Sequence, residues 1–183
     1  MTTTDFTHRL ARPSDISALK PLMAESIRAL LKDFLPPPAV EASFEVMGLD
    51  TRLIDDGTYF VIECDGAIAG CGGWSRRNTL FGGDHAAVRN DALLDPRNDA
   101  ARVRAMYTSP RFVRRGVGRL VLSLCERAAA SEGFRRAELA ATLAGEPLYR
   151  ACGYEEIERI EAPTSKGICI PLIRMGKAIS NPP

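Results

Sequence analysis

A strand, a basic turn that contains glycine, and a helix follow one another directly between residues 101 and 132, and this succession most constrains the fold. Residues 102–108 form a strand-like run, which Ser109-Pro110 interrupts. Beyond the turn, apolar residues recur at helical spacing, namely Val117, Leu120, Val121, Leu124, Cys125 and Ala128. The sequence therefore predicts a strand that feeds a turn opening an amphipathic helix.

The start of this helix has the properties of a phosphate-binding site. The first N–H groups of a helix have no partner within it, and the helix dipole places positive potential at that end. Gly116 and Gly118 lack a Cβ, which lets a ligand approach the main chain, and Arg114, Arg115 and Arg119 add charge. These residues alone are equally compatible with a basic helix start that faces solvent.

Two other phosphate-binding motifs are excluded by their spacing. A dinucleotide fingerprint requires a third glycine where this chain has Val121. A Walker loop requires Gly-Lys-Ser or Gly-Lys-Thr, and the chain contains neither.

The same stretch resembles motif A of the GNAT acetyltransferase superfamily, in which a strand precedes a turn such as Arg-Arg-Gly-Val-Gly-Arg at the start of a helix. Further on, Pro-Leu-Tyr-Arg-Ala-Cys-Gly-Tyr at residues 147–154 resembles motif B of that family. The two motifs lie at the separation usual for the family, and together they are far more specific than either alone. The order of predicted elements resembles the family over nearly the whole chain.

The resemblance implies an α/β (α+β) fold in a single domain over residues 1–183. Its expected core is a mixed, mostly antiparallel twisted sheet of about seven strands, flanked by helices. The fourth and fifth strands, near residues 102–108 and 137–143, are expected to splay apart.

The resemblance also implies acetyl-CoA as cosubstrate and assigns residues to it. The pantetheine arm would lie along Met106, Tyr107 and Thr108 like an added strand. The diphosphate would lie on main-chain N–H groups of the segment Arg114, Arg115, Gly116, Val117, Gly118 and Arg119.

By the same resemblance, Tyr149 is the catalytic residue that donates to the sulfur of CoA as the thiol leaves. A phenol pKa near 10 against a thiol pKa near 8.5 makes full proton transfer unfavourable by about 2 kcal/mol, so the hydroxyl would act mainly as a hydrogen-bond donor. The alternative is an aromatic side chain that only packs on a short helix.

Two positions depart from the family pattern. Val113 stands where the family often has Gln or Arg, three residues before the first glycine, so main-chain amides and Arg114 or Arg115 must hold the diphosphate. Motif B often has an Asn several residues before the tyrosine, and this chain offers Thr142-Leu143-Ala144.

Composition excludes several other classes of protein. The chain has 183 residues, 45% of them apolar, which fits one globular domain, and its net charge of +1 gives no field for nucleic acid. Five well-separated cysteines without a Cys-x-x-Cys pair indicate neither a disulfide framework nor a zinc site. The sequence shows no signal peptide and no membrane span, so we expect a cytoplasmic protein with no metal, membrane or nucleic-acid partner. A homodimer is left open.

The remaining elements follow from local signals. Residues 7–11 predict a first strand, Ser14 can cap a helix in which Pro21 causes a kink or a restart, and Pro36-Pro37-Pro38 precedes a second helix from Ala39 to Gly57. Asp65-Gly66 predicts a hairpin, and Gly70, Gly72 and Gly73 indicate a bulge, a twisted strand or a close approach of backbone or ligand. The last strands are expected at residues 154–161 and 168–175.

Residues 78–100 form a long polar segment, and loops of this length in a compact domain are usually functional or mobile. Its Asp84 and His85 are candidate bases, although such a pair is more often a turn residue and a solvated neighbour. Glu25 and Glu63 are further candidates, and the strand at 102–108 holds no carboxylate. No base is assigned.

We therefore expect direct transfer of an acetyl group from acetyl-CoA to a primary amine of a small-molecule acceptor. The first two helices are expected to form the wall on the acceptor side. The alternative is a noncatalytic acyl-CoA-binding sensor or interaction module, which a pocket closed by Phe34, Phe44 or Trp74 would favour. Hydrolytic chemistry has no support, because the chain lacks a Gly-x-Ser-x-Gly elbow.

Overall fold

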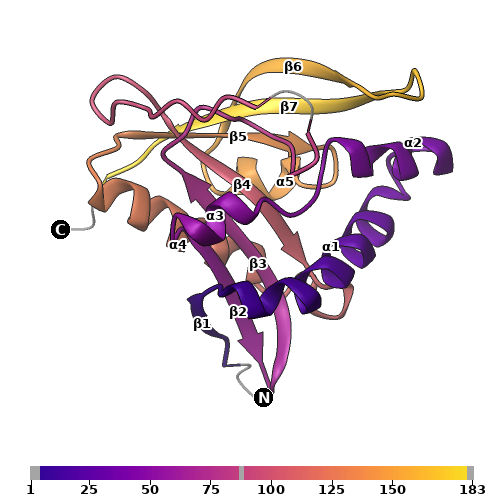
Figure 1. Cartoon of the computed structure of the whole chain (residues 1–183), viewed down its shortest axis with the longest axis horizontal. Coiled ribbons are helices and arrows are strands. Elements are labelled where there is room, and N and C mark those ends of the chain that lie inside the picture. The colour runs from indigo at the N-terminus through magenta and orange to yellow at the C-terminus, as the bar shows by residue number, and fades with distance from the viewer. Residues whose placement is uncertain (1–4, 87–88, 181–183) are drawn as a thin grey trace.

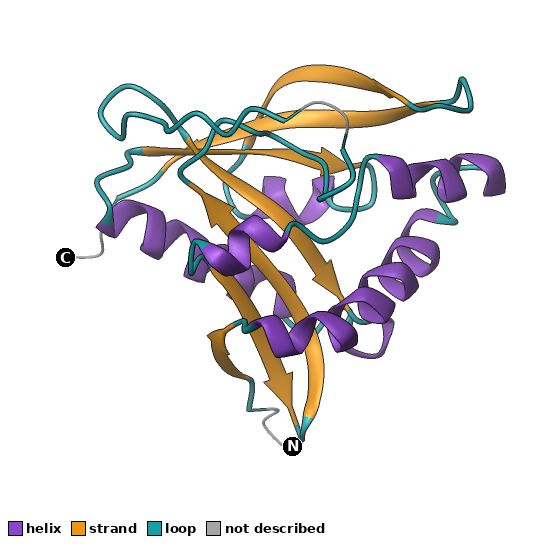
Figure 2. Cartoon of the chain, viewed as in Figure 1, coloured by secondary structure: helices purple, strands orange, loops and turns teal. Residues whose placement is uncertain are grey.

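The structure is a computed structural model that describes residues 5–86 and 89–180. One mixed sheet forms its centre, with strand order β1-β2-β3-β4-β5-β7-β6 (Figures 1 and 2). The strands are β1 (Thr7–Leu10), β2 (Tyr59–Cys64), β3 (Ala67–Ser75), β4 (Ala101–Thr108), β5 (Arg136–Thr142), β6 (Glu155–Pro163) and β7 (Cys169–Ala178). The β4–β5 pair is parallel and the other described neighbours are antiparallel, which confirms the predicted sheet.

Helices cover both faces of this sheet. They are α1 (Ile16–Leu31), α2 (Pro37–Ala42), α3 (Thr51–Asp55), α4 (Val117–Ser131) and α5 (Glu146–Ala151). In Figure 1, α1, α2 and α3 lie in front of the sheet, and α4 and α5 lie behind it. A core cluster that contains Val121 and Trp74 lies on the α4 side, and a second cluster that contains Leu19 and Tyr59 lies on the α1 side.

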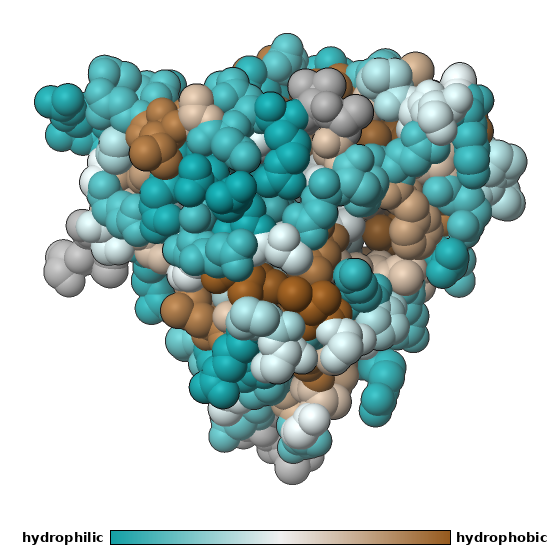
Figure 3. Space-filling model, viewed as in Figure 1, coloured by the Kyte–Doolittle hydropathy of each residue, from teal (hydrophilic) through white to brown (hydrophobic). Residues whose placement is uncertain are grey.

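The front face carries polar and apolar regions. Figure 3 shows polar side chains over the part crossed by the segment 78–100, and apolar surface near the centre of the same face. Among the described residues, none of the helices combines the length and the hydropathy that a membrane span needs.

The N-terminal helices differ in detail from the prediction. Ser14 does not cap α1, because a short turn at Pro13–Asp15 precedes the helix and the Asp15 carboxylate accepts a hydrogen bond from the Arg12 N–H at 2.7 Å. The helix continues through Pro21 without a restart. The predicted second helix is divided into α2, a 3-10 turn at Ser43–Glu45, and α3.

The hairpin predicted at Asp65-Gly66 is confirmed. Cys64 pairs with Ala67 across a two-residue turn, and both turn residues have positive φ, 51° at Asp65 and 76° at Gly66. These are the backbone angles of a type I′ turn, which matches the twist of the two strands.

Gly70 and Gly72 of β3 allow the close approach of a helix rather than of a ligand. A Cβ on Gly70 would lie 2.5 Å from the Val117 side chain, and a Cβ on Gly72 would lie 2.6 Å from the Val121 side chain. Neither contact is sterically possible, so these glycines allow α4 to pack directly on the strand. The expected bulge in β3 is also present, since the adjacent residues Ile62 and Glu63 of β2 pair with Gly70 and Ile68.

The predicted splay of β4 and β5 is confirmed. The two strands pair only at Ala101↔Ala137 and Arg102↔Glu138. On its other edge, β4 remains paired to β3 as far as Thr108. The edges of β4 and β5 that face each other therefore carry main-chain groups without a strand partner beyond the first two pairs.

A bulge in β4 determines which side chains face the opening. Ala105 has φ 51°, in the left-handed region, and its carbonyl accepts a hydrogen bond from the Tyr59 hydroxyl at 2.7 Å. Val103 and Met106 both pack with the cluster on the α4 side, whereas Tyr107 belongs to the cluster on the α1 side. The bulge thus places Tyr107, in place of Met106, on the same face as Arg104.

Candidate active site

A groove of about 750 Å³ lies where β4 and β5 diverge, bounded by α1, the turn before α4, and α5. The predicted site residues that line it are Met106, Tyr107, Thr108, Arg114, Gly116, Val117, Gly118, Arg119 and Tyr149. The fold thus brings motif A, motif B and the end of β4 to one place. Val113, at the first departure from the family pattern, also lines the groove.

The start of α4 presents unpaired main-chain donors to this groove. Leu120 makes the first helical hydrogen bond, from its N–H to the Gly116 carbonyl at 3.0 Å, so the N–H groups of Val117, Gly118 and Arg119 precede the helical ladder. Gly116 has φ 90°, and a Cβ there would meet no atom within 4 Å. The left-handed backbone conformation therefore explains why residue 116 is a glycine, and the space beside it is open.

Gly118 has a different reason to be glycine. A Cβ at this position would lie 2.7 Å from Cδ2 of Leu148, the residue before Tyr149 on α5. Close packing of α5 on the first turn of α4 accounts for the glycine, and this contact fixes the helix that carries Tyr149.

Arg115 is not brought into the groove with its neighbours. Its guanidinium lies over the ring of Phe112, 5.1 Å from the centroid, and over Phe6 at 5.9 Å. These cation–π contacts hold the side chain beside the turn. Arg114 and Arg119 are the arginines of motif A that line the groove.

Tyr149 lines the groove from α5. Its hydroxyl donates to Sδ of Met106 at 3.8 Å, and its ring packs edge-on against Tyr154. Burial, followed by the nearby Cys125 and Cys152 thiols, raises the pKa of Tyr149 above the ordinary value for a phenol. The group is therefore a protonated hydrogen-bond donor, and a thioether is a weak acceptor for it.

A smaller cavity of about 90 Å³ adjoins the groove through the opening between β4 and β5. Five residues line both spaces, namely Met47, Met106, Tyr107, Thr142 and Tyr149. The Tyr107 hydroxyl accepts a hydrogen bond from the Gly48 N–H at 2.8 Å, which fixes the segment that follows α2 at the cavity wall. Thr142, near the second departure from the family pattern, accepts from the Gly145 N–H at 3.1 Å.

None of the four candidate bases lines either space among the described residues. The Asp84 carboxylate accepts from the N–H and the hydroxyl of Thr51, at 2.9 and 3.0 Å. Nε2 of His85 lies 2.7 Å from the Phe44 carbonyl, which can only accept, so this nitrogen is the donor. Glu63 is paired with Arg9, and Glu25 is exposed. Asp84 and His85 thus hold the loop against α3 and the turn before it.

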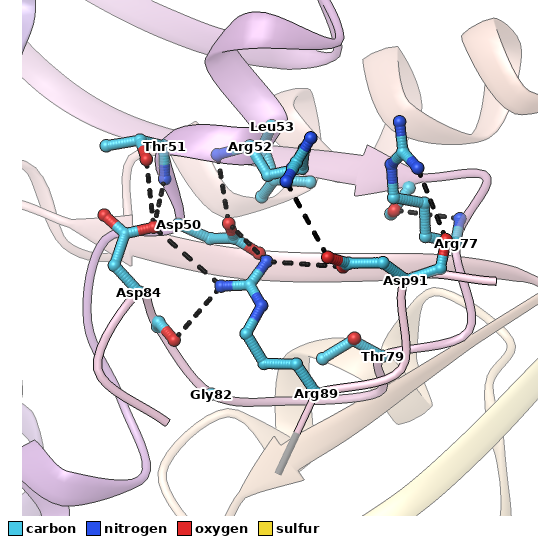
Figure 4. A network of polar contacts seen from close by, with 12 residues as sticks. Asp50, Thr51, Arg52, Leu53, Arg77, Thr79, Gly82, Asp84, Arg89 and Asp91 are labelled. Carbon is cyan, nitrogen blue, oxygen red and sulfur yellow. Dashed lines mark hydrogen bonds and ion pairs between the residues drawn. The ribbon is translucent and has the colours of Figure 1, made fainter. Parts of the chain in front are cut away.

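The residues that sequence reasoning missed form a buried ionic network around Asp50. This carboxylate is fully buried and accepts from Arg104 at 2.5 Å and from Arg89 at 3.1 Å. It also caps α3 by accepting from the Arg52 N–H at 3.1 Å. Figure 4 shows the Arg89 guanidinium between Asp50, Asp84 and Asp91, which ties the segment 78–100 to α3.

The burial of Arg104 could have been predicted from the sequence. Arg102 and Arg104 alternate in a strand predicted at the centre of the sheet, so they share a face that other elements must cover. A buried guanidinium requires an anionic partner, but the sequence does not indicate which carboxylate supplies it.

Comparisons with known proteins agree with this geometry. A sequence model of the acetyltransferase (GNAT) family matches residues 24–154. No curated protein matches the chain significantly in sequence.

Solved structures share the fold at low sequence identity. A GCN5-related N-acetyltransferase from Rhodopseudomonas palustris is 18% identical, with 98% of this chain and 99% of that chain covered and a TM-score of 0.72. The PaiA N-acetyltransferase from Thermoplasma acidophilum, solved with coenzyme A, is 11% identical, with 95% and 99% covered and a TM-score of 0.64. A phosphinothricin acetyltransferase from Sinorhizobium meliloti, solved with acetyl-CoA, is 20% identical, with 96% and 89% covered and a TM-score of 0.63. Since the family match extends over most of the sequence and includes both motifs, the chain belongs to the GNAT family of acetyltransferases.

Proposed function

We propose that this protein transfers the acetyl group of acetyl-CoA to a primary amine of a small-molecule acceptor. The observation that carries the proposal is the position of Tyr149, a half-buried donor at the junction of a large groove and a small cavity. Two adjoining spaces that share the Tyr149 side chain suit a reaction that joins two substrates.

The residues of the groove fit acetyl-CoA. The N–H groups of Val117, Gly118 and Arg119 would hold its diphosphate, with Arg114 and Arg119 adding charge. The unpaired edge of β4 at Met106–Thr108 would hold the pantetheine arm through main-chain hydrogen bonds. When bound, acetyl-CoA supplies the activated acetyl group and a thiol leaving group.

Tyr149 would assist departure of the thiol. Because burial raises its pKa, the phenol keeps its proton and donates a hydrogen bond to the sulfur as negative charge develops. The Met106 thioether is its partner in this structure, at 3.8 Å, and a thiolate is the better acceptor.

The acceptor must attack as a neutral amine. A lysine-like amine loses its proton at a cost of roughly 4–5 kcal/mol at pH 7. The described lining of the small cavity holds no carboxylate and no imidazole, so the proposal assigns no side chain as base. Desolvation of the amine in this cavity favours its neutral form.

The observations support an enzyme over a sensor. Phe34 lines the groove but is 49% exposed, Phe44 lies under Arg28, and Trp74 packs in the core against Phe134. None of the three closes the small cavity.

The test is a screen of amines with thiol release from acetyl-CoA as the readout. The panel should contain amino acids, diamines, polyamines, aminoglycosides and peptide N-termini. We expect at least one class to accelerate thiol release well above acetyl-CoA hydrolysis. Tight acetyl-CoA binding without acceleration by any amine would instead favour the noncatalytic module.

A further inference from the structure

The wall of the small cavity contains one charged side chain. Among the described residues that line it, Arg104 is the only ionisable group other than the two tyrosines Tyr107 and Tyr149. The Arg104 side chain is 3% exposed, and it comes from β4, two residues beyond the last residue that pairs with β5. A positive charge therefore lies beside the position at which the acceptor would meet the thioester.

Arg104 has one carboxylate partner among the described residues, and a second arginine uses the same carboxylate. Asp50 is shared by Arg104 and Arg89, and it also accepts a hydrogen bond from a main-chain N–H. Arg89 has Asp84 and Asp91 nearby as well, whereas Asp50 is the carboxylate that contacts Arg104 among the described residues.

The hydrogen bonds of Arg104 are also incomplete. One terminal nitrogen donates to Asp50 and the other to the Gly82 carbonyl, but Nε has no partner among the described residues. A guanidinium carries five N–H donors, and buried donors without acceptors are rare in native proteins. Asp50 and the Gly82 carbonyl therefore do not use all the donors of the Arg104 guanidinium.

We propose that Arg104 binds a carboxylate of the acceptor, which makes the acceptor an amine that carries an anionic group, as an α-amino acid does. This inference rests on the proposed function. Apolar side chains in the same wall, among them Phe81 and Leu172, suit an apolar substituent of the acceptor. The same positive charge disfavours diamines and polyamines, and it also disfavours the protonated form of the attacking amine.

The experiment compares amino acids with their carboxamides, using glycine, alanine and methionine in matched pairs and thiol release from acetyl-CoA. The amine of a carboxamide is the weaker base and so is more fully neutral, which biases the comparison against the inference. A site built for a charged group rejects the analogue that lacks it, so we expect kcat/KM to be at least about tenfold higher for the acids.

Arg104→Lys and Arg102→Lys form a matched pair of variants. Both residues lie on one face of β4 with Nε unpartnered and a terminal nitrogen on a carboxylate, but Arg102 does not line the cavity. Arg104→Lys should raise KM for the acids and bring the acid-to-amide ratio close to one, while kcat/KM for the amides stays within a few fold. Arg102→Lys should keep the wild-type ratio. Retention of the melting-temperature shift with acetyl-CoA checks the fold of each variant.

The outcomes separate the two proposals. Thiol release with amides or diamines as fast as with acids would overturn the role of Arg104 and leave the proposed function standing. Loss of the ratio in both variants would also overturn it, because a general effect on the sheet would then explain the change. If Arg104→Lys does not fold, the ratio of kcat/KM between acids and carboxamides in the wild-type protein decides whether the inference stands. If acetyl-CoA binds but no amine accelerates thiol release, the proposed function is rejected, and this inference is rejected with it.

Discussion

Replacing Tyr149 with Phe should separate binding from catalysis, because the Tyr149 hydroxyl contributes little to the stability of the fold. Its hydrogen bond is to a thioether at 3.8 Å, and the ring keeps its edge-on contact with Tyr154 in the variant. A net hydrogen bond contributes about 1 kcal/mol, and a weak acceptor gives less. We therefore expect the melting temperature to change by no more than about 4 °C.

Turnover should respond very differently. If the hydroxyl stabilises the departing sulfur, its loss should lower kcat by about 10²–10⁴, which corresponds to roughly 3–5 kcal/mol of activation free energy. Acetyl-CoA affinity should stay within a few fold, since the groove and the start of α4 are unchanged. Thiol release with a responsive amine and calorimetric titration with acetyl-CoA measure the two quantities separately.

Tyr154→Phe is the control for this experiment. Tyr154 is a buried tyrosine in contact with Tyr149, but it lines neither the groove nor the small cavity. Its variant should keep turnover within a few fold of wild type. Turnover of Tyr149→Phe at a comparable level would refute the reasoning and leave Tyr149 as a packing residue.

Three further predictions follow from the groove, from the α4–α5 contact and from one ion pair. Acetyl-CoA at about a hundredfold over its dissociation constant should add roughly 2.7 kcal/mol and raise the melting temperature by about 5–10 °C in a thermal scan; equal shifts with NAD or ATP would contradict a specific site. Gly118→Val should clash with Leu148, 2.7 Å away, and lower both stability and turnover, and Leu148→Ala should partly restore them; no rescue would place the cause elsewhere. Arg77 lowers the pKa of Asp56 by hydrogen bonding, so the stability from this pair is present above pH of about 4 and is lost as the pH falls below that value. The deficit in melting temperature of Asp56→Asn should therefore shrink on acidification, and a constant deficit would exclude the ion pair as its source.

The parts of the fold that the sequence predicted depend on local signals. Asp65-Gly66 specifies a type I′ turn through its own backbone preferences, and the apolar spacing after Gly116 specifies α4 within a few turns. The resemblance of both motifs to the GNAT family then supplied the splay of β4 and β5, which no local pattern encodes. The gathering of the motif residues in one groove follows from that splay.

The parts that were missed depend on contacts between distant segments. The left-handed φ of Ala105 is stabilised by a hydrogen bond from Tyr59, 46 residues earlier, and nothing around Ala105 in the sequence announces a bulge. Arg104 finds its partner in Asp50, 54 residues away. The reason for Gly118 likewise became visible only once Leu148 was placed beside it.

The divergence of β4 from β5 has an evolutionary consequence. Recognition through main-chain groups depends on backbone shape, so any side chain that keeps the strand extended preserves it. Under the proposed function, mutations at Met106 or Tyr107 would therefore alter the small cavity while the main-chain contacts to the pantetheine arm stay the same. Acceptor preference would then change by point mutation within one scaffold, without loss of the main-chain contacts that hold the cosubstrate.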